Sequence, residues 1–124
     1  MSRPFLSLDQ VDQGVRNQVQ TDYQETVQEV IQAVNSEPVV VVGMKHNPHV
    51  IRARKALNKA GVDFVYLEYG SYTAEWRRRT AIKMWSGWHT FPQVFVRGVL
   101  IGGASETIGM LQSGELQQRL QDQA

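Results

Sequence analysis

The chain has 124 residues, enough for one domain with a buried core, and it carries 13 basic and 12 acidic residues. The resulting net charge of +1 gives no general reason to expect nucleic acid or a membrane surface as a partner, and no apolar run has the roughly 20 residues of a membrane span. The absence of cysteine excludes disulfides, a thiolate nucleophile, and iron–sulfur or zinc sites built on this chain's own sulfur.

Residues 1–20 are predicted to form an extension in front of a domain that spans residues 21–124. They contain no apolar signal-peptide core, which leads us to expect a cytoplasmic protein. A capping-box pattern at residues 7–10 and a set of apolar residues at helical spacing indicate a short helix; these are Leu8, Val11, Val15 and Val19. We expect this helix to lie on the domain or to form the contact of a homodimer.

The next segment predicts a helix followed by a buried strand. Residues 21–24 fit a capping box, and an apolar stripe along the helix consists of Tyr23, Val27, Val30, Ile31 and Val34. Residues 35–38 end the helix. The continuous apolar run at 39–42 is typical of a central strand that is covered on both faces.

A second helix is predicted to begin at Asn47, because Asn is favoured at the N-cap and Pro48 at the first helical position. The residues expected to face inward are Val50, Ile51, Ala53, Leu57 and Ala60. Gly61 is a natural stop, and residues 64–67 predict the second strand.

A third helix is predicted over residues 74–86, with Thr73 as its cap. We expect its inward face to carry Trp76, Ala81, Ile82 and Trp85. Residues 77–79, all arginine, indicate a solvated helix face from which one side chain can reach an anionic ligand.

Residues 88–103 predict a hairpin with strands at 93–96 and 99–101 and a turn at 97–98. Pro92 removes a backbone donor where the first strand begins, and Trp88 is expected to line a groove beside it. Gly102 and Gly103 permit close approach of a ligand and open a helix that Ser105 is expected to cap. A short last helix follows at 115–121.

This order of elements predicts an α/β fold. A right-handed crossover between the first two strands makes them parallel, and the hairpin completes a four-stranded mixed sheet with helices on both faces. We therefore expect a thioredoxin-like fold with an extra N-terminal helical segment.

Several of these motifs together resemble the second half of a glutaredoxin. They are the Trp-His-Thr-Phe-Pro-Gln run at 88–93, the Val-Arg-Gly turn at 96–98, Ile-Gly-Gly at 101–103 and Gly-Glu-Leu at 114–116. The leading Trp and the Thr-Phe-Pro-Gln run favour the monothiol branch of that family. The resemblance covers roughly residues 23–120.

The resemblance places the family's active-site tetrapeptide on residues 47–50, where Asn47 stands in the position of the nucleophilic Cys. In the family, the helix N-terminus stabilises the thiolate. Asn47 cannot form a mixed disulfide, so we expect neither thiol–disulfide exchange nor an iron–sulfur cluster on this chain. His46 and His49 flank this position, but neither has a local carboxylate partner, and we expect no metal site.

The resemblance also implies positions for a bound glutathione. The main chain of Phe91, next to Pro92, would pair with the γ-glutamyl-cysteine part. Lys45 and Arg79 would bind the glycine carboxylate, with Lys83 one turn after Arg79.

The two glycines hold the γ-glutamyl end in the family, together with an Asp two residues on. Gly103 is kept here, but Ser105 replaces the Asp. Losing that carboxylate removes a partner for the ligand's ammonium group, worth about 1–3 kcal/mol.

The function we expect from the sequence is non-catalytic binding of glutathione, or of an extended peptide or protein partner, in redox homeostasis. Affinity would come from main-chain pairing and basic residues, with no nucleic acid or membrane involved. One alternative is a glutathione-dependent, transferase-like enzyme, in which Asn47, His49 or the helix N-terminus stabilises the ligand's thiolate. The other is a structural role, in which residues 1–20 form a homodimer that covers the groove.

Overall fold

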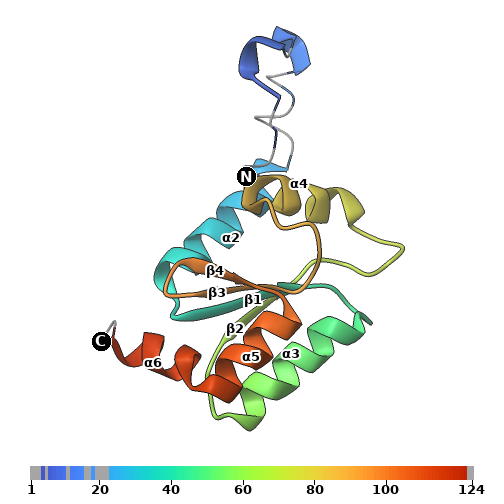
Figure 1. Cartoon of the computed structure of the whole chain (residues 1–124). Helices are drawn as coiled ribbons and strands as arrows, with labels where there is room; N and C mark the ends of the chain where they lie inside the picture. Colours follow the sequence, from blue (N-terminus) through green and yellow to red (C-terminus); the bar gives the residue numbers. More distant parts are fainter. Residues whose placement is uncertain (1–3, 5, 11, 16–17, 19–22, 123–124) are drawn as a thin grey trace.

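The computed structural model in Figure 1 describes residues 4, 6–10, 12–15, 18 and 23–122. Its helical elements are the 3-10 turn η1 (Leu8–Gln10), α2 (Gln24–Ser36), α3 (Pro48–Lys59), α4 (Trp76–Ser86), α5 (Ala104–Ser113) and α6 (Glu115–Asp122). The strands are β1 (Val39–Gly43), β2 (Val65–Glu68), β3 (Gln93–Val96) and β4 (Val99–Gly102). No helix in the described ranges is long and apolar enough to cross a membrane.

The four strands form one mixed sheet in the order β2-β1-β3-β4. β1 runs parallel to β2 and antiparallel to β3, and β3 and β4 form the antiparallel hairpin. Helices α2 and α4 cover one face, while α3 and α5 cover the other (Figure 1). The predicted thioredoxin-like arrangement is therefore confirmed.

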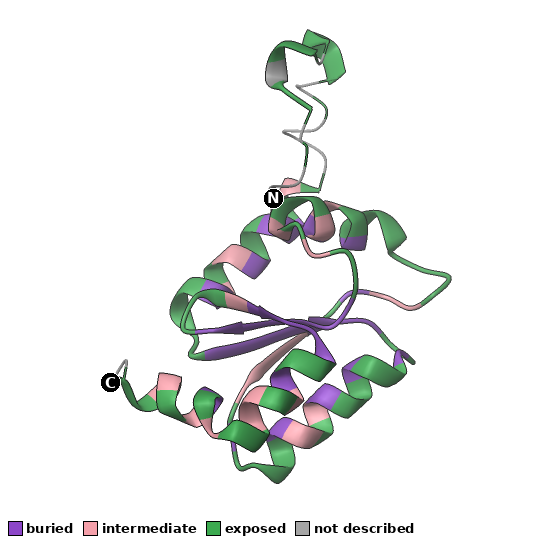
Figure 2. Ribbon diagram, in the orientation of Figure 1, coloured by how far each residue is buried: buried purple, intermediate pink, exposed green. Residues whose placement is uncertain are grey.

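Strand β1 is buried along its whole length, as its continuous run of valines predicts. Val40 and Val42 pack with Val30 of α2 and with Ile82 of α4. Val39 and Val41 point the other way and pack with Leu57 and Leu116. Figure 2 shows the buried strands between the two helical layers. Because successive side chains of a strand alternate between its faces, β1 contributes to both cores.

Most of the apolar stripe predicted for helix α2 is buried, but the predicted start of the helix differs from the structure. Thr26, Val27, Val30 and Val34 are buried. Tyr23 is the N-cap residue, in the left-handed region at φ 58°, and no side chain caps the helix there. The expectation that Tyr23 lies on the inward stripe is wrong, since it precedes the first turn and is exposed. Thr21, on which the predicted capping box depended, lies outside the described residues.

Helix α3 begins as predicted, with Asn47 as its N-cap. Val50, Ala53 and Leu57 face inward, but Ile51 and Ala60 are exposed, so their predicted burial is wrong. Each residue turns about 100° around a helix, which carries Ile51 off the face formed by Val50, Ala53 and Leu57.

Helix α4 departs most from its prediction. It begins at Trp76, after Glu75 in a left-handed conformation, because residues 71–74 close a separate turn that contains Thr73. Trp76 and Trp85 are 57% and 39% exposed, so their predicted place in the core is wrong. One side of Trp85 packs on Phe95, with ring centroids 5.7 Å apart. The buried residues of α4 are Ile82, as predicted, and Arg79.

Helix α5 begins two residues earlier than expected. Gly103 is its N-cap, so Ser105 lies inside the first turn and does not cap the helix. In the extension, η1 spans Leu8–Gln10, and the backbone N–H of Ser7, directly before it, donates to Gln10 Oε1 at 3.0 Å. Val11 and Val19 of the predicted extension helix lie outside the described residues.

Candidate functional site

The predicted site residues meet at one end of the sheet because of the strand registers. Val42 pairs with Gln93, and Val94 pairs with Gly102. The end of β1, the start of β3 and the end of β4 therefore lie together. The segments that continue from them are the 44–47 loop, residues 91–92 and the turn into α5.

A fourth segment, residues 69–75, joins this end of the sheet through main-chain hydrogen bonds. The N–H of Tyr69 donates to the carbonyl of Gly43 at 2.9 Å, and the N–H of Lys45 donates to the carbonyl of Gly70 at 2.7 Å. These bonds extend the β1–β2 pairing beyond the strands and position the Lys45 backbone, while its side chain is exposed.

Asn47 lies at the positive end of α3. Its Oδ1 accepts the backbone N–H groups of His49 at 2.9 Å and Val50 at 3.2 Å, and the residue is buried. The first four N–H groups of a helix have no intrahelical acceptor, so this side chain satisfies two of them. The position therefore holds a neutral amide in contact with donors that can stabilise an anion.

The two histidines beside Asn47 point to solvent. His46 and His49 are both exposed. Across the described part of the chain, no three side chains of His, Cys, Asp or Glu come together in a group that could hold a metal ion.

Arg79 is 7% exposed, and its guanidinium is engaged with the 69–75 segment. Nη1 donates to the carbonyls of Tyr69 at 3.0 Å and of Ala74 at 2.5 Å. The structure thus gives Arg79 a role in holding this loop against α4. Its expected contact with a ligand carboxylate stays a prediction.

Tyr69 anchors the same segment from its other side. Its hydroxyl donates to a carboxylate oxygen of Glu29 on α2. Burial, together with this bond and the negative charge of Glu29, raises the pKa of Tyr69 well above its usual value. The hydroxyl is therefore neutral throughout the physiological range and acts as a fixed donor.

Phe91 and Pro92 are joined by a cis peptide bond directly before β3. The Phe91 side chain is buried in the core between α2, α4 and the sheet. Lys83 Nζ lies 5.5 Å from the centroid of the Phe91 ring. With its side chain in the core, Phe91 has only its main chain available to a ligand.

The turn into α5 contains Glu106, which was not among the site residues predicted from the sequence. The N–H of Gly103 donates to Glu106 Oε1 at 2.8 Å. Gly102 has φ 120°, and a Cβ added to it would lie 2.7 Å from Cγ of Glu106, so only glycine fits there. The sequence pattern that could have identified Glu106 is the Gly-x-x-Glu spacing of residues 103–106, which is the spacing of a capping box.

Ser105 is exposed, and its Oγ lies 3.3 Å from Nη2 of Arg52 on α3, which donates to it. The position where the family has an Asp thus faces a cation. Arg52 was not a candidate in the sequence, because the pairing of α3 with α5 joins residues 53 positions apart.

Trp88 lies behind this turn. Its Nε1–H is buried and has no hydrogen-bond partner within the described ranges. The atom lies 3.7 Å from the point where a Cβ on Gly103 would stand. Trp88 is also held by Gln93, which is fully buried and whose Nε2 donates to the Trp88 carbonyl at 2.9 Å.

Comparisons with known proteins agree with this geometry. A family model described as Glutaredoxin matches residues 39–101. A "Glutaredoxin-like protein" of Dictyostelium discoideum is 45% identical over 84% of this chain and 85% of its own length. A "Probable monothiol glutaredoxin GrlA" of Legionella pneumophila is 39% identical over 57% of this chain and 76% of its own length.

Among solved structures, a crystal structure of a buckwheat glutaredoxin–glutathione complex superposes with a TM-score of 0.70 and 26% identity, covering 81% of this chain and 91% of that one. The resemblance read from the sequence motifs is confirmed, including relatives of the monothiol kind. The chain, which has no cysteine at all, is a member of the glutaredoxin family.

Proposed function

We propose that this protein binds glutathione, or the extended segment of a partner protein, at this end of the sheet without thiol chemistry of its own. The observation that carries the proposal is Asn47. It holds the N-cap of α3 through two hydrogen bonds at the position that the family uses for its nucleophile. The cis Phe91–Pro92 bond and the turn at residues 102–103, which the family resemblance assigns to ligand binding, support the proposal.

The chemistry of an amide supports the non-catalytic part of the proposal. A thiol of ordinary pKa near 8.5 becomes reactive when a helix N-terminus lowers that pKa. Asn47 has no ionisable atom, and its oxygen already accepts two N–H groups of α3. A resident iron–sulfur cluster does not fit this donor set either, because it requires a thiolate from the chain.

Three features support binding of an anionic, extended ligand. The N-termini of α3 and α5 point toward the same end of the sheet and carry partial positive charge. Lys45 is exposed beside Asn47, and Lys83 stands over Phe91. The buckwheat relative with a similar fold was crystallised with glutathione.

The same features fit an extended peptide, whose main chain can pair with Phe91 in the way a glutathione backbone would.

The transferase-like alternative is less well supported. A glutathione thiolate would have to compete with Asn47 Oδ1 for the N–H groups of His49 and Val50. A role in redox homeostasis, a cytoplasmic location and a homodimer remain predictions from the sequence.

Calorimetric titration with reduced glutathione tests the proposal. We expect weak binding that Lys45→Ala reduces, because the exposed ammonium attracts a ligand carboxylate. Lys59→Ala, which removes the same charge from the far end of α3, is the matched control and should leave the titration unchanged. No heat at millimolar glutathione would exclude the small-ligand form and leave the peptide form, which a similar titration with glutathionylated peptides addresses. A spectrophotometric conjugation assay with a general electrophile, run on the same samples, should show no rate above background.

A further inference from the structure

The outer face of α4 carries large apolar side chains that the domain leaves uncovered. Trp76 is 57% exposed and Met84 63%, and Tyr23 at the start of α2 lies exposed beside them. Ile82 fills the core from the opposite side of the same helix. Apolar residues on both sides of a helix indicate that both sides are covered, and the domain covers only one.

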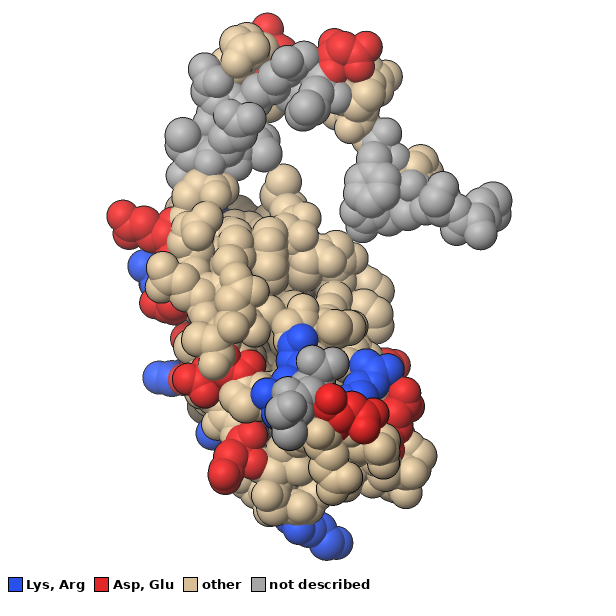
Figure 3. Space-filling model, turned by 90° about the vertical axis from the view of Figure 1, so that its left-hand side faces the viewer, with Lys and Arg blue, Asp and Glu red and all other residues tan. Residues whose placement is uncertain are grey.

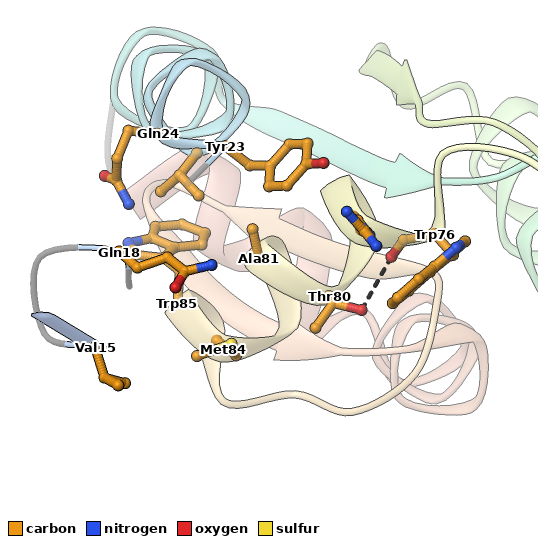
Figure 4. A pocket seen from close by; sticks show the side chains of 11 residues that line it. Val15, Gln18, Tyr23, Gln24, Trp76, Thr80, Ala81, Met84 and Trp85 are labelled. Atoms are coloured by element: carbon orange, nitrogen blue, oxygen red, sulfur yellow. Dashed lines mark hydrogen bonds between the residues drawn. The ribbon is translucent and has the colours of Figure 1, made fainter. Parts of the chain in front are cut away.

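A cavity of about 620 Å³ lies over this outer face (Figure 4). One wall is α4, including Trp76, Met84 and Trp85, and a second wall is the start of α2. The third side comes from the N-terminal extension, through Val15 and Gln18. The extension therefore already stands at the edge of the apolar face.

The uncovered face carries little charge. Among the side chains that line the cavity, Arg77 carries a charge, and its guanidinium stacks 5.2 Å from the centroid of the Trp76 ring. Residues 1–20 contain two Asp, at positions 9 and 12, and two Arg, at positions 3 and 16, so their side-chain charges cancel. The domain surface directly below the extension is otherwise largely uncharged in Figure 3. A segment with no net side-chain charge that carries an apolar residue suits such a surface.

We propose that the segment carrying Val15 and Gln18 acts as a strap that closes over the outer face of α4 in its own molecule, with Val15 as its apolar anchor. Val15 is only eight residues before Tyr23, which itself lines the cavity. Eight extended residues reach at most about 28 Å, so the tether keeps Val15 close to α4 at high effective concentration. A second copy of the chain would first have to offset the entropy of association.

The strap explains why α4 has tryptophans on its outer side. It also brings the extension next to the helix that holds the 69–75 loop through Arg79. This inference does not depend on which ligand the sheet end binds, because none of the cavity's lining residues belongs to that site.

Cross-linking in the full chain tests the strap directly, since a protein without cysteine reacts only at introduced thiols. Val15→Cys with Met84→Cys should form an intramolecular disulfide on oxidation in dilute solution. The matched control is Val15→Cys with Ile51→Cys, whose second position is equally apolar and exposed but lies on α3, across the sheet. We expect the first pair to close at least about tenfold faster. Equal rates, or disulfide-linked dimers as the main product of the first pair, would overturn the proposal.

A second measurement needs no new thiol. Val15→Asp should open the strap and increase the quenching of tryptophan fluorescence by acrylamide, because Trp76 and Trp85 lose their cover. Leu6→Asp, an exposed apolar position of the extension outside the cavity lining, is the control. If both variants leave quenching unchanged, or if light scattering shows that the unaltered chain is a dimer that Val15→Asp dissociates, the strap in its own molecule is wrong.

Discussion

The side-chain oxygen of Asn47 accepts the backbone N–H of Val50 at 3.2 Å, one turn into α3. A helix N-terminus that can stabilise a thiolate is thus occupied by an amide of its own chain. The segments at residues 91–92 and 102–103 lie at the same end of the sheet as this N-terminus.

Replacing that amide with a thiol should restore chemistry. In Asn47→Cys, the N–H groups of His49 and Val50 become available, and the helix N-terminus should lower the thiol pKa below about 8.5. We expect measurable glutathione-dependent reduction of a mixed disulfide. Asn47→Ser, which keeps a capping hydroxyl without a thiol, should stay inactive. An inactive Cys variant that still folds would mean that the surrounding groove has diverged.

Asn47 should also contribute to stability as a cap. Asn47→Ala removes the acceptor of two N–H groups and should lower the free energy of unfolding by about 1 kcal/mol. Urea denaturation of the two proteins measures the difference. Asn47→Asp keeps an acceptor at the same place and should lose little or nothing. Equal losses in the Ala and Asp variants would contradict the cap.

Arg79 should be a structural anchor of the 69–75 loop. Arg79→Ala removes a charged donor from two carbonyls, through one buried and one part-buried hydrogen bond, and we expect a loss of about 2–4 kcal/mol in the free energy of unfolding. Arg77→Ala, two positions earlier and exposed, should change stability by less than about 0.5 kcal/mol. If Arg79→Ala is as stable as Arg77→Ala, the buried contacts contribute nothing and a ligand role for Arg79 gains support.

Glu106 should fix the turn into α5. Glu106→Ala leaves the N–H of Gly103 without its acceptor and should cost about 1 kcal/mol in thermal or urea unfolding. Glu115→Ala, at the first position of α6 and exposed, serves as a comparison for the loss of an exposed carboxylate near a helix start. We expect Glu106→Ala also to alter glutathione titrations, since it changes the donors at this end of the site. Identical titrations would show that the turn takes no part in binding.

Tyr66 should make stability depend on alkaline pH. Burial, with the hydrogen bond and charge of Glu68, raises the pKa of Tyr66 from 10.0 to about 12, although Arg54 acts against the shift. The folded protein therefore holds a proton that the unfolded chain releases. The neutral Tyr66 hydroxyl makes its full contribution to the free energy of unfolding below pH 10. This contribution is lost as the pH rises toward 12.

The variant Tyr66→Phe should consequently show a flatter decline of the unfolding free energy between about pH 10 and pH 12. Urea denaturation at several alkaline pH values measures this slope. Tyr72→Phe, at an exposed tyrosine, should keep the slope of the unaltered protein. Equal slopes for the two variants would mean that Tyr66 does not titrate as its surroundings imply.

The order of elements, the N-cap at Asn47, the hairpin and the lack of thiol chemistry were all determined by the sequence alone. The reason is that each depends on local chemistry: a valine run, an Asn-Pro start, a Gly turn and the absence of cysteine. The family resemblance belongs with them, since its motifs are contiguous.

Only the tertiary structure decided which surfaces are covered. Arg79 is buried because the 69–75 loop, which precedes α4, folds back and supplies its acceptors. Arg52 reaches Ser105 because α3 and α5 pack together. Trp76 and Trp85 are as apolar as core residues, but α4 is turned so that Ile82 takes the inner side. Hydrophobicity predicts that a residue will be covered, whereas the packing of elements far apart in the chain decides what covers it.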